Sequence, residues 1–370
     1  MRVGVPKEIK NHEYRVGLVP GSVREYVANG HEVLVQTGAG AGIKVSDADY
    51  EAAGAKIAPD AKTVFAESDM IVKVKEPQTN EWVQLREGQL LYTYLHLAPD
   101  PDQTRGLLES GVTAIAYETV TDPFGGLPLL APMSEVAGRL SIQAAAYALT
   151  AHQGGRGLLM GGVPGVLPAK VVVIGGGVVG THAARMAVGL GADVVILDRS
   201  QRRMAELDDM FNGRAKTRYS TFEALDEETD NADVVVGAVL IPGASAPKLV
   251  TREMLKGMKE GAVLVDVAID QGGCFETSKA TTHADPTYVV DDVLHYCVAN
   301  MPGAVPLTSS HALNNATLQY GLMLANKGLD ALREDKHLRN GLNTHRGAIT
   351  YKAVAEALGA EYVPPLDAIK

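Results

Sequence analysis

The stretch VVVIGGGVVGTHAARMAVGLGADVVILDRS, residues 171–200, decides the fold. Its first apolar run ends at Gly175, which forms GxGxxG spacing with Gly177 and Gly180, and a second apolar run ends at Asp198. The first glycine permits a tight turn, the second lets the backbone approach a pyrophosphate, and the third lets helix and strand pack closely. A carboxylate 18 positions after the last glycine can accept hydrogen bonds from ribose hydroxyls. The stretch therefore predicts a strand–turn–helix–strand unit that binds a dinucleotide.

The choice between the two nicotinamide dinucleotides depends on the charges after this motif. Asp198 favours NAD because the 2'-phosphate of NADP would meet its negative charge. Arg199, Arg202 and Arg203 follow directly, however, and such side chains could hold that phosphate. NAD is the expected cofactor, with NADP as the alternative.

The rest of the chain predicts α/β architecture with parallel sheets, because short runs rich in Val and Ile alternate with helix-like segments. A chain of 370 residues also exceeds the usual size of a single core, so two doubly wound domains are expected. Gly and Pro accumulate at residues 123–132, where we place a boundary. Beyond residue 306 the pattern predicts only helices and a loop, with one helix from Ser309 to about Glu334, and these helices must pack on a sheet built earlier. The expected strands are residues 2–5, 31–36, 69–75, 89–95, 112–117, 170–177, 193–198, 233–240, 262–270 and 287–293.

Composition excludes several classes of function. Apolar residues make up 46% and charged residues 21%, which is typical of a globular protein. The net charge is 34 minus 44, or -10, so a nucleic acid partner is not expected. No segment approaches about 18 uninterrupted apolar residues, and the charged amino terminus does not resemble a signal peptide, so no membrane association is expected.

Cysteine usage fits a reducing cytoplasm, and histidine usage gives no sign of a zinc site. Cys274 and Cys297 are the two cysteines, and neither belongs to a CxxC pair, so no disulfide framework is predicted. The ten histidines form no HExxH motif, and no metal site is predicted.

Candidate catalytic residues follow the predicted strands. Ligands of doubly wound sheets bind outside the carboxyl ends of the strands, and Lys75, His96 and Asp270 stand at such ends. Taken singly, each is as well explained by packing or solvation, but their shared placement favours function. Arg15 could bind a carboxylate through two parallel hydrogen bonds, although an arginine taken alone more often forms a surface ion pair. Its charged neighbours Lys7, Glu8, Lys10 and Glu13 are interpreted as ordinary solvated charge.

Seven motifs in order resemble one family end to end. They are VPKEIKNHEYRVGLVPGSV, VKVKEP, YTYLHLAPD, VVVIGGGVVG, LDRS, VDVAIDQGG and VANMPGAVP. They resemble the alanine dehydrogenase/pyridine nucleotide transhydrogenase family, and its alanine dehydrogenases in particular. The resemblance implies a cytoplasmic, hexameric, NAD-dependent enzyme that interconverts L-alanine with pyruvate and ammonium. In such an enzyme Arg15 and Lys75 would hold the substrate, and His96 and Asp270 would act as acid/base groups.

The resemblance also implies the domain plan and the cofactor contacts. A Rossmann NAD-binding domain, residues 131–305, would be inserted in a discontinuous substrate domain made of residues 1–130 and 306–370. The residues expected to contact NAD are Ser134, Gly175, Gly177, Val178, Val179, Gly180, Asp198, Arg203, Ser220, Val239, Leu240, Ala268, Ile269, Asp270, Val298, Ala299, Asn300 and Met301.

Two other functions remain open. The NAD-binding subunit of proton-translocating transhydrogenase resembles the chain along most of its length, but it lacks the histidine of YLHLAP and is commonly continued by membrane-spanning segments. A catalytically silent NAD-responsive binding module would use the same fold, although the presence of Arg15, Lys75, His96 and Asp270 together argues against it. A saccharopine-type dehydrogenase is a weaker third possibility.

Overall fold

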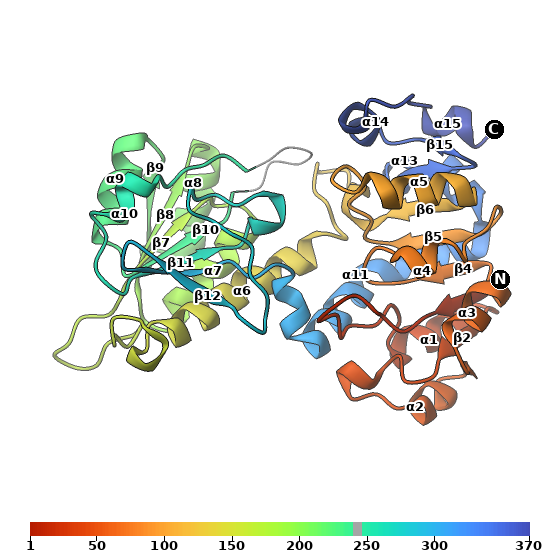
Figure 1. Ribbon diagram of the computed structural model, residues 1–370, viewed down its shortest axis with the longest axis horizontal. Helices are drawn as coiled ribbons and strands as arrows, with labels where there is room; N and C mark the ends of the chain where they lie inside the picture. Colours follow the sequence, from red (N-terminus) through yellow and green to blue (C-terminus); the bar gives the residue numbers. More distant parts are fainter. Residues whose placement is uncertain (240–245) are drawn as a thin grey trace. The chain divides into compact units, whose positions relative to one another are not determined.

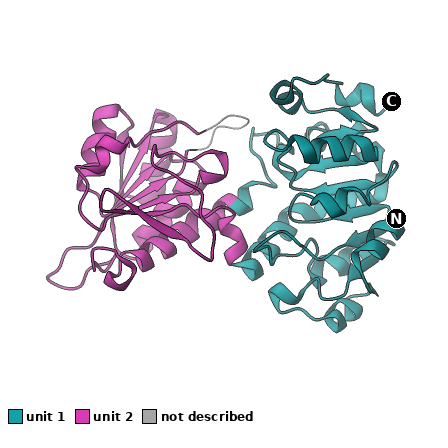
Figure 2. Ribbon diagram, viewed as in Figure 1, with its two compact units in different colours: residues 1–133, 305–370 teal, residues 134–304 magenta. Residues whose placement is uncertain are grey.

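The chain forms two compact units, each with a mostly parallel sheet. The computed structural model describes residues 1–239 and 246–370. Unit 1 comprises Met1–Met133 and Val305–Lys370, and unit 2 comprises Ser134–Ala304 (Figure 2). Unit 1 is therefore built from both ends of the chain, whereas unit 2 is one continuous segment. The predicted α/β class with two domains is confirmed.

Unit 1 is organised around an eight-stranded sheet. Its strands, in spatial order, are β15 (Ala348–Ile349), β14 (Leu342–His345), β6 (Thr113–Ala116), β5 (Leu90–Thr93), β4 (Met70–Val72), β1 (Arg2–Val5), β2 (Glu32–Gln36) and β3 (Lys56–Ala58). The strands from β6 to β3 in this order are parallel to one another, and β14 is antiparallel to both β6 and β15. Most of their apolar residues are buried, as in sheets covered on both faces.

The helices of unit 1 begin and end at the expected signals. Helix α5 has Pro101 in its first turn and Asp100 as a cap that accepts from the backbone amide of Gln103, and it ends before Gly111, whose φ is 68°. The carboxyl-terminal helix α11 returns to the sheet, since the hydroxyl of Tyr92 donates to the carbonyl oxygen of Thr317 over 3.1 Å. The helices in this unit are α1 (Pro20–Ala28), α2 (Asp47–Ala52), α3 (Ala61–Glu67), α4 (Thr79–Trp82), α5 (Pro101–Ser110), α11 (Pro306–Lys327), α12 (Leu329–Glu334), α13 (Lys336–Arg339), α14 (Lys352–Leu358) and α15 (Pro365–Ala368), while α6 (Ala131–Ala148) crosses into unit 2 (Figure 1).

The prediction that no strand follows residue 306 is wrong. β14 and β15 extend the sheet beyond β6, and β14 is buried although it reads LNTH. Two of its three polar side chains are satisfied inside: the side-chain amide of Asn343 donates to Thr119 over 2.8 Å, and His345 bonds the hydroxyl of Thr113 over 2.8 Å. The buried hydroxyl of Thr344 has no hydrogen-bond partner among the described residues. The interior position of β14 depends on hydrogen bonds more than on apolar side chains, so a pattern of apolar runs does not predict this strand. The three-residue β3 was missed because it is too short to form a pattern.

Unit 2 contains a seven-stranded sheet. Its order is β12 (Thr287–Val290), β13 (Val293–Tyr296), β11 (Val263–Asp266), β10 (Val234–Gly237), β7 (Lys170–Ile174), β8 (Asp193–Asp198) and β9 (Ala215–Tyr219). All neighbours are parallel except β12, which is antiparallel to β13. The strand order therefore reverses direction at β7, and ligands bind at such a switch point.

Helices cover both faces of this second sheet. One core contains Val171, Val173 and Val194 with residues of α6 and of α7 (Val178–Gly189). The other contains Val172 and Val235 with residues of α9 (Phe222–Asn231) and α10 (Arg252–Leu255), and α8 (Gln201–Phe211) follows β8. Alternate residues of each strand thus enter opposite cores, which is the doubly wound arrangement.

Two strands of unit 2 depart from the sequence prediction. β9, which reads AKTRY, lies at the sheet edge, where polar residues are tolerated, and its apolar content is too low to predict a strand. Residues 287–293 were expected to form one strand, but Asp291 and Asp292 take positive φ values of 48° and 60°. They form a tight turn between β12 and β13, so the segment is a hairpin.

Candidate functional site

One edge of the unit 1 sheet gathers the candidate substrate residues. β6, β5, β4 and β1 are consecutive in the sheet and parallel, so the segments that follow them leave from the same edge. Arg15 lies in the segment after β1, Lys75 in that after β4, and His96 in that after β5. The structure therefore brings these three residues to one edge. Lys75 was expected to end its strand, but β4 ends at Val72, so Lys75 lies on the following loop.

Arg15 is held by a neighbouring carboxylate. Its side chain is 2% exposed, and its Nε and Nη2 donate to the two carboxylate oxygens of Glu13 over 2.7 and 2.6 Å. Its Nη1 contacts the sulfur of Met133 at 3.1 Å. Burial by itself lowers the pKa of Arg15, but Glu13 outweighs it, so the pKa lies above its ordinary value. The interpretation of Glu13 as a solvated charge is wrong, because Glu13 is buried and orients the guanidinium.

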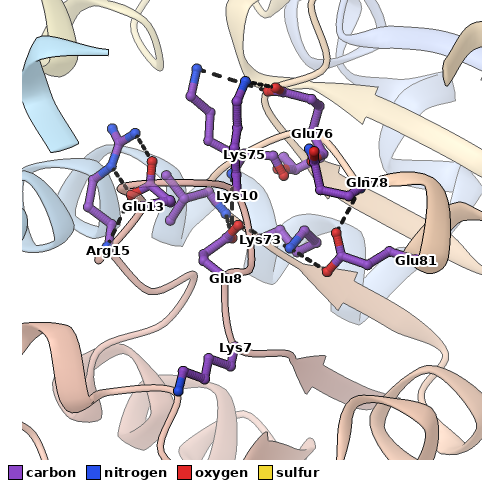
Figure 3. Close-up of polar contacts among 12 residues, drawn as sticks. Lys7, Glu8, Lys10, Glu13, Arg15, Lys73, Lys75, Glu76, Gln78 and Glu81 are labelled. Atoms are coloured by element: carbon purple, nitrogen blue, oxygen red, sulfur yellow. Dashed lines mark hydrogen bonds and ion pairs between the residues drawn. The ribbon is translucent and has the colours of Figure 1, made fainter. Parts of the chain in front are cut away.

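A second buried network lies under Lys75 (Figure 3). Lys73 is fully buried, and its Nζ bonds Glu8 over 3.0 Å and Glu81 over 2.9 Å. The other oxygen of Glu8 accepts from the backbone amides of Val74 over 2.7 Å and of Lys75 over 3.4 Å. Burial raises the pKa of Glu8 above its ordinary value, although Lys73 opposes the change. The interpretation of Glu8 as solvated is therefore also wrong: it fixes the backbone that carries Lys75.

His96 is not packed in the interior. Its side chain is 45% exposed, and its backbone has a φ of 51°, a left-handed conformation that is uncommon outside glycine. The imidazole stacks on the ring of Tyr94, with centroids 5.8 Å apart and planes at 4°. Tyr94 is in turn fixed by its hydroxyl, which donates to the carbonyl oxygen of Leu129 over 2.6 Å. The ring thus stands on a rigid platform with one face and one edge available.

Glu118 holds the strained backbone of His96, and sequence reasoning missed it. One of its carboxylate oxygens accepts from the backbone amide of His96 over 2.7 Å and from that of Leu95 over 3.2 Å, and lies 3.8 Å from Nδ1 of His96. The signal that could have found it is its position: it follows β6, the neighbour of the strand that precedes His96. The same strand-end rule that selected His96 also selects this carboxylate.

The glycine-rich turn of unit 2 has the geometry that its spacing predicts. Gly175 adopts a φ of 100°, which a larger residue rarely takes. A Cβ on Gly180 would lie 1.8 Å from the carbonyl oxygen of Gly175, so helix and turn pack without room for a side chain. Among the described residues, and apart from its chain neighbours, no protein atom lies within 4 Å of a Cβ built on Gly177, which is the residue before the first turn of α7. The turn is therefore open where the helix begins, as a pyrophosphate requires.

Asp198 and Arg203 brace this turn from β8 and α8. The carboxylate of Asp198 accepts from the amide of Gly176 over 2.7 Å and from that of Ser200 over 2.8 Å. Arg203 donates through Nε to the carbonyl oxygen of Gly176 and through Nη2 to the hydroxyl of Thr181, both over 2.7 Å. Both predicted cofactor residues thus lie against the glycine turn.

Asp270 is exposed on the turn after β11, and a buried carboxylate organises this turn. Asp266, the last residue of β11, is fully buried and accepts from the amides of Ala268 over 3.1 Å and Cys274 over 2.8 Å, and from the hydroxyl of Ser278. Burial raises the pKa of Asp266 above its ordinary value, although these hydrogen bonds oppose the change. Asp266 is another residue that sequence reasoning missed, since it supports the turn without being exposed.

The remaining predicted cofactor residues lie mainly along the carboxyl edge of the unit 2 sheet. Val178 and Val179 form the first turn of α7, Ser220 follows β9, Val239 follows β10, Ala268 and Ile269 follow β11, and Val298, Ala299, Asn300 and Met301 follow β13. Ser134 lies on α6, at the start of unit 2. Leu240 lies outside the described residues. Asp270 belongs to unit 2, whereas Arg15, Lys75 and His96 belong to unit 1.

Across residues 1–239 and 246–370, His, Cys, Asp and Glu side chains form no group of three that could hold a metal ion. Over the same residues, no helix is both long and apolar enough to cross a membrane.

Both parts of the chain match models of one protein family. The model described as "Alanine dehydrogenase/PNT, N-terminal domain" matches residues 4–137, and that described as "Alanine dehydrogenase/PNT, C-terminal domain" matches residues 141–352. The chain belongs to this family. The resemblance inferred from the seven motifs is confirmed.

Individual members of the family match nearly the full length. The alanine dehydrogenase of Halomonas elongata is 61% identical over 364 residues, which cover 98% of each chain. A solved L-alanine dehydrogenase superposes with a TM-score of 0.94 at 52% identity, covering 97% of this chain and 99% of that one. A solved transhydrogenase from Sinorhizobium meliloti gives a TM-score of 0.80 at 27% identity, covering 95% of this chain and all of that one. The family's two branches thus share the fold, and the alanine dehydrogenases match more closely.

Proposed function

We propose that this chain catalyses the reversible, NAD-dependent oxidative deamination of L-alanine to pyruvate and ammonium. The observation that carries the proposal is His96, which is exposed and held by Glu118 at the sheet edge that also bears Arg15 and Lys75. The 61% identity to an alanine dehydrogenase along 98% of both chains supports the same reaction.

Arg15 and Lys75 are assigned to the substrate carboxylate. Both are cationic, and both lie on loops that a buried carboxylate fixes. A guanidinium and an ammonium at one sheet edge hold an α-amino or α-keto acid by its carboxylate, which orients the α-carbon. Such positioning turns an encounter into an intramolecular step.

His96 and Asp270 are assigned to proton transfer. When bound, NAD accepts a hydride from the α-carbon of the substrate. The amine must first be neutral, and the resulting imine must then add water and lose ammonia, so protons move at the nitrogen and at the attacking oxygen. Imidazole performs such transfers near neutral pH, and the stacked, partly exposed ring of His96 leaves a ring nitrogen accessible. Asp270, an exposed carboxylate, is assigned to polarise the attacking water.

NAD is the proposed cofactor, and unit 2, with boundaries near residues 131 and 305, is proposed as its domain. The residues present fit the group: none of the described residues fills the space beside Gly177, and the start of α7 offers backbone amides there. Asp198 disfavours a 2'-phosphate by its charge. Arg203, the nearest cation to the turn, already donates to Gly176 and Thr181 and pairs with Glu206, which supports NAD over NADP.

A homohexamer in the cytoplasm is the proposed state of the protein. The segment between α6 and β7 exposes four apolar side chains, of which Leu167 is 85% and Leu159 is 64% exposed, with Val163 and Val166 joined in a short hairpin beside them. Exposed apolar residues gathered in one segment favour association with another chain. Cys274 and Cys297 are both buried and unpaired, which suits a reducing compartment.

The reaction is tested by mixing purified protein with NAD and L-alanine and following NADH absorbance. Alanine-dependent NADH formation is expected, and His96→Ala is expected to abolish turnover while NAD affinity stays within about twofold. NAD binding without alanine turnover would instead support the silent binding module. Hydride transfer to a second nucleotide-binding protein, with no reaction of alanine, would support the transhydrogenase alternative.

A further inference from the structure

Two ion clusters lie near the substrate edge of unit 1, one with more carboxylates than cations and one with more cations than carboxylates (Figure 3). In the deeper cluster, one cation, Lys73, lies between two carboxylates, Glu8 and Glu81. In the outer cluster, one carboxylate, Glu76, lies between two cations, Lys10 and Lys75. The outer cluster therefore carries a surplus positive charge, and it contains the lysine assigned to the substrate.

The two lysines of the outer cluster contact Glu76 unequally. Lys10 hydrogen-bonds one carboxylate oxygen, whereas Nζ of Lys75 stays 3.9 Å from the other, beyond hydrogen-bond distance. That second oxygen is buried and has no hydrogen-bond partner among the described residues. The side chains of Glu76 and Lys75 are 11% and 13% exposed, so water screens their interaction weakly.

Glu76 is ionised at neutral pH in this arrangement. Burial by itself raises its pKa, but Lys75 and Lys10 outweigh burial, so the pKa lies below its ordinary value. A buried carboxylate with one unsatisfied oxygen attracts any nearby ammonium strongly. If Lys10 were absent, Lys75 would be the remaining cation of the cluster, and it would be drawn onto Glu76.

We propose that Lys10 is a positioning residue: by pairing with Glu76, it keeps the ammonium of Lys75 available for the carboxylate of the substrate. This inference rests on the proposed function, because it assumes that Lys75 binds that carboxylate. The sequence interpretation of Lys10 as ordinary solvated charge misses this role, since Lys10 is only partly exposed and its partner is buried.

The test is a double-mutant cycle on Lys10 and Glu76. Lys10→Met is expected to raise KM for L-alanine and for pyruvate about tenfold, the scale of one partly buried ion pair, and to leave kcat within about twofold. In a Glu76→Gln background, where no carboxylate competes for Lys75, Lys10→Met is expected to change KM by less than about twofold. The matched control is Lys7→Met, because Lys7 lies in the same segment but points away from the cluster (Figure 3).

The outcomes separate this inference from the proposed function. An unchanged KM in Lys10→Met would overturn the proposed role of Lys10. An equal rise of KM in both backgrounds would also overturn it, because Lys10 would then act without Glu76. NAD affinity and melting temperature, measured on every variant, exclude general damage to the fold. Absence of alanine turnover in the unmodified protein would instead reject the proposed function itself.

Discussion

Replacing Glu118 should disable His96 without removing it. Glu118 accepts the backbone amides of His96 and Leu95 and lies 3.8 Å from the imidazole Nδ1. Glu118→Ala removes every one of these contacts, and Glu118→Gln keeps an oxygen acceptor but loses the charge. The left-handed backbone at His96 then loses the group that holds it, and the ring is expected to leave the orientation in which it transfers protons.

The size of the effect follows from those contacts. A hydrogen bond to a charged acceptor contributes about 1.5–3 kcal/mol. A non-glycine residue in the left-handed region costs about 1–3 kcal/mol, which is released when the backbone relaxes. If the free energy that fixes His96 is lost from the transition state, kcat should fall about 100-fold in Glu118→Ala and about tenfold in Glu118→Gln.

The assay is initial-rate kinetics with L-alanine and NAD, with NAD affinity and melting temperature measured on the same samples. The kcat is expected to fall while KM for alanine changes less than about threefold, because Arg15 and Lys75 hold the substrate independently. Glu109→Gln is the matched control, since Glu109 is exposed on α5 of the same unit. Turnover of Glu118→Ala within about twofold of the unmodified protein would refute the reasoning, as would a parallel loss of NAD binding and folding.

Three further predictions concern unit 2. Gly180→Ala should lower the melting temperature and abolish NAD binding, because its Cβ would lie 1.8 Å from a backbone oxygen. Gly177→Ala should fold normally, because its Cβ contacts none of the described residues beyond its chain neighbours. It should nevertheless lose NAD affinity at least about tenfold, since the Cβ would occupy the space of the pyrophosphate. Titration with NADH fluorescence and thermal melting separate the two. Cys274 should not react with a thiol reagent at pH 8 in the folded protein but should react in urea, because it is buried and burial raises its pKa to about 12. Cys297 is also buried with a raised pKa and should behave in the same way. Burial lowers the pKa of His295, so below about pH 6.5 the unfolded chain binds more protons than the folded one, and stability should fall as the pH drops. Melting curves from pH 8 to 5 should show a smaller fall in His295→Gln.

Each of these predictions has a clear contrary result. Unchanged NAD affinity in Gly177→Ala would show that no dinucleotide phosphate approaches the turn. Rapid labelling of either thiol in the folded protein would show that the cores around them open readily. An equal loss of melting temperature with falling pH in His295→Gln would assign the acid sensitivity to other groups.

The sequence predicted the elements whose signal is local. Residues 171–200 form the strand, turn, helix and strand that the glycine spacing requires, and the strands before Lys75 and His96 are where their apolar runs place them. Elements that depend on distant partners were not predictable. β14 is polar and buried only because side chains more than 200 residues away accept or donate its hydrogen bonds.

The same limit explains the misread charges near Arg15. Glu8 and Glu13 stand in a segment dense in charged residues, and such a segment is usually solvated. Their burial depends on Lys73, which is 65 positions from Glu8, and on the guanidinium of Arg15. No local pattern distinguishes a carboxylate that pairs with a buried cation from one that faces water. The sequence therefore indicated the candidate cations near Arg15 but not the carboxylates that pair with them.

Five carboxylates at these sites, four of which the sequence did not predict, share one physical task. Loops that carry functional side chains leave backbone amides without partners, because no helix or strand ladder satisfies them. A carboxylate satisfies such amides with charge-assisted hydrogen bonds, which are stronger than neutral ones. The pairs are Glu13 with the amide of Arg15, Glu8 with that of Val74, Glu118 with that of His96, Asp198 with that of Gly176 and Asp266 with that of Cys274.

This arrangement explains why carboxylates accumulate around a site assigned to an anionic substrate. Glu13, Glu8 and Glu76 pair with cations, so the positive charge presented to the substrate is the surplus that these pairs leave. Each of the five carboxylates named above also fixes a loop by its backbone amides. Removing such a carboxylate would therefore increase the net positive charge and still be expected to reduce catalysis, because orientation is lost. A change in rate that followed net charge alone, with Glu118→Gln and Glu8→Gln both faster than the unmodified protein, would contradict this account.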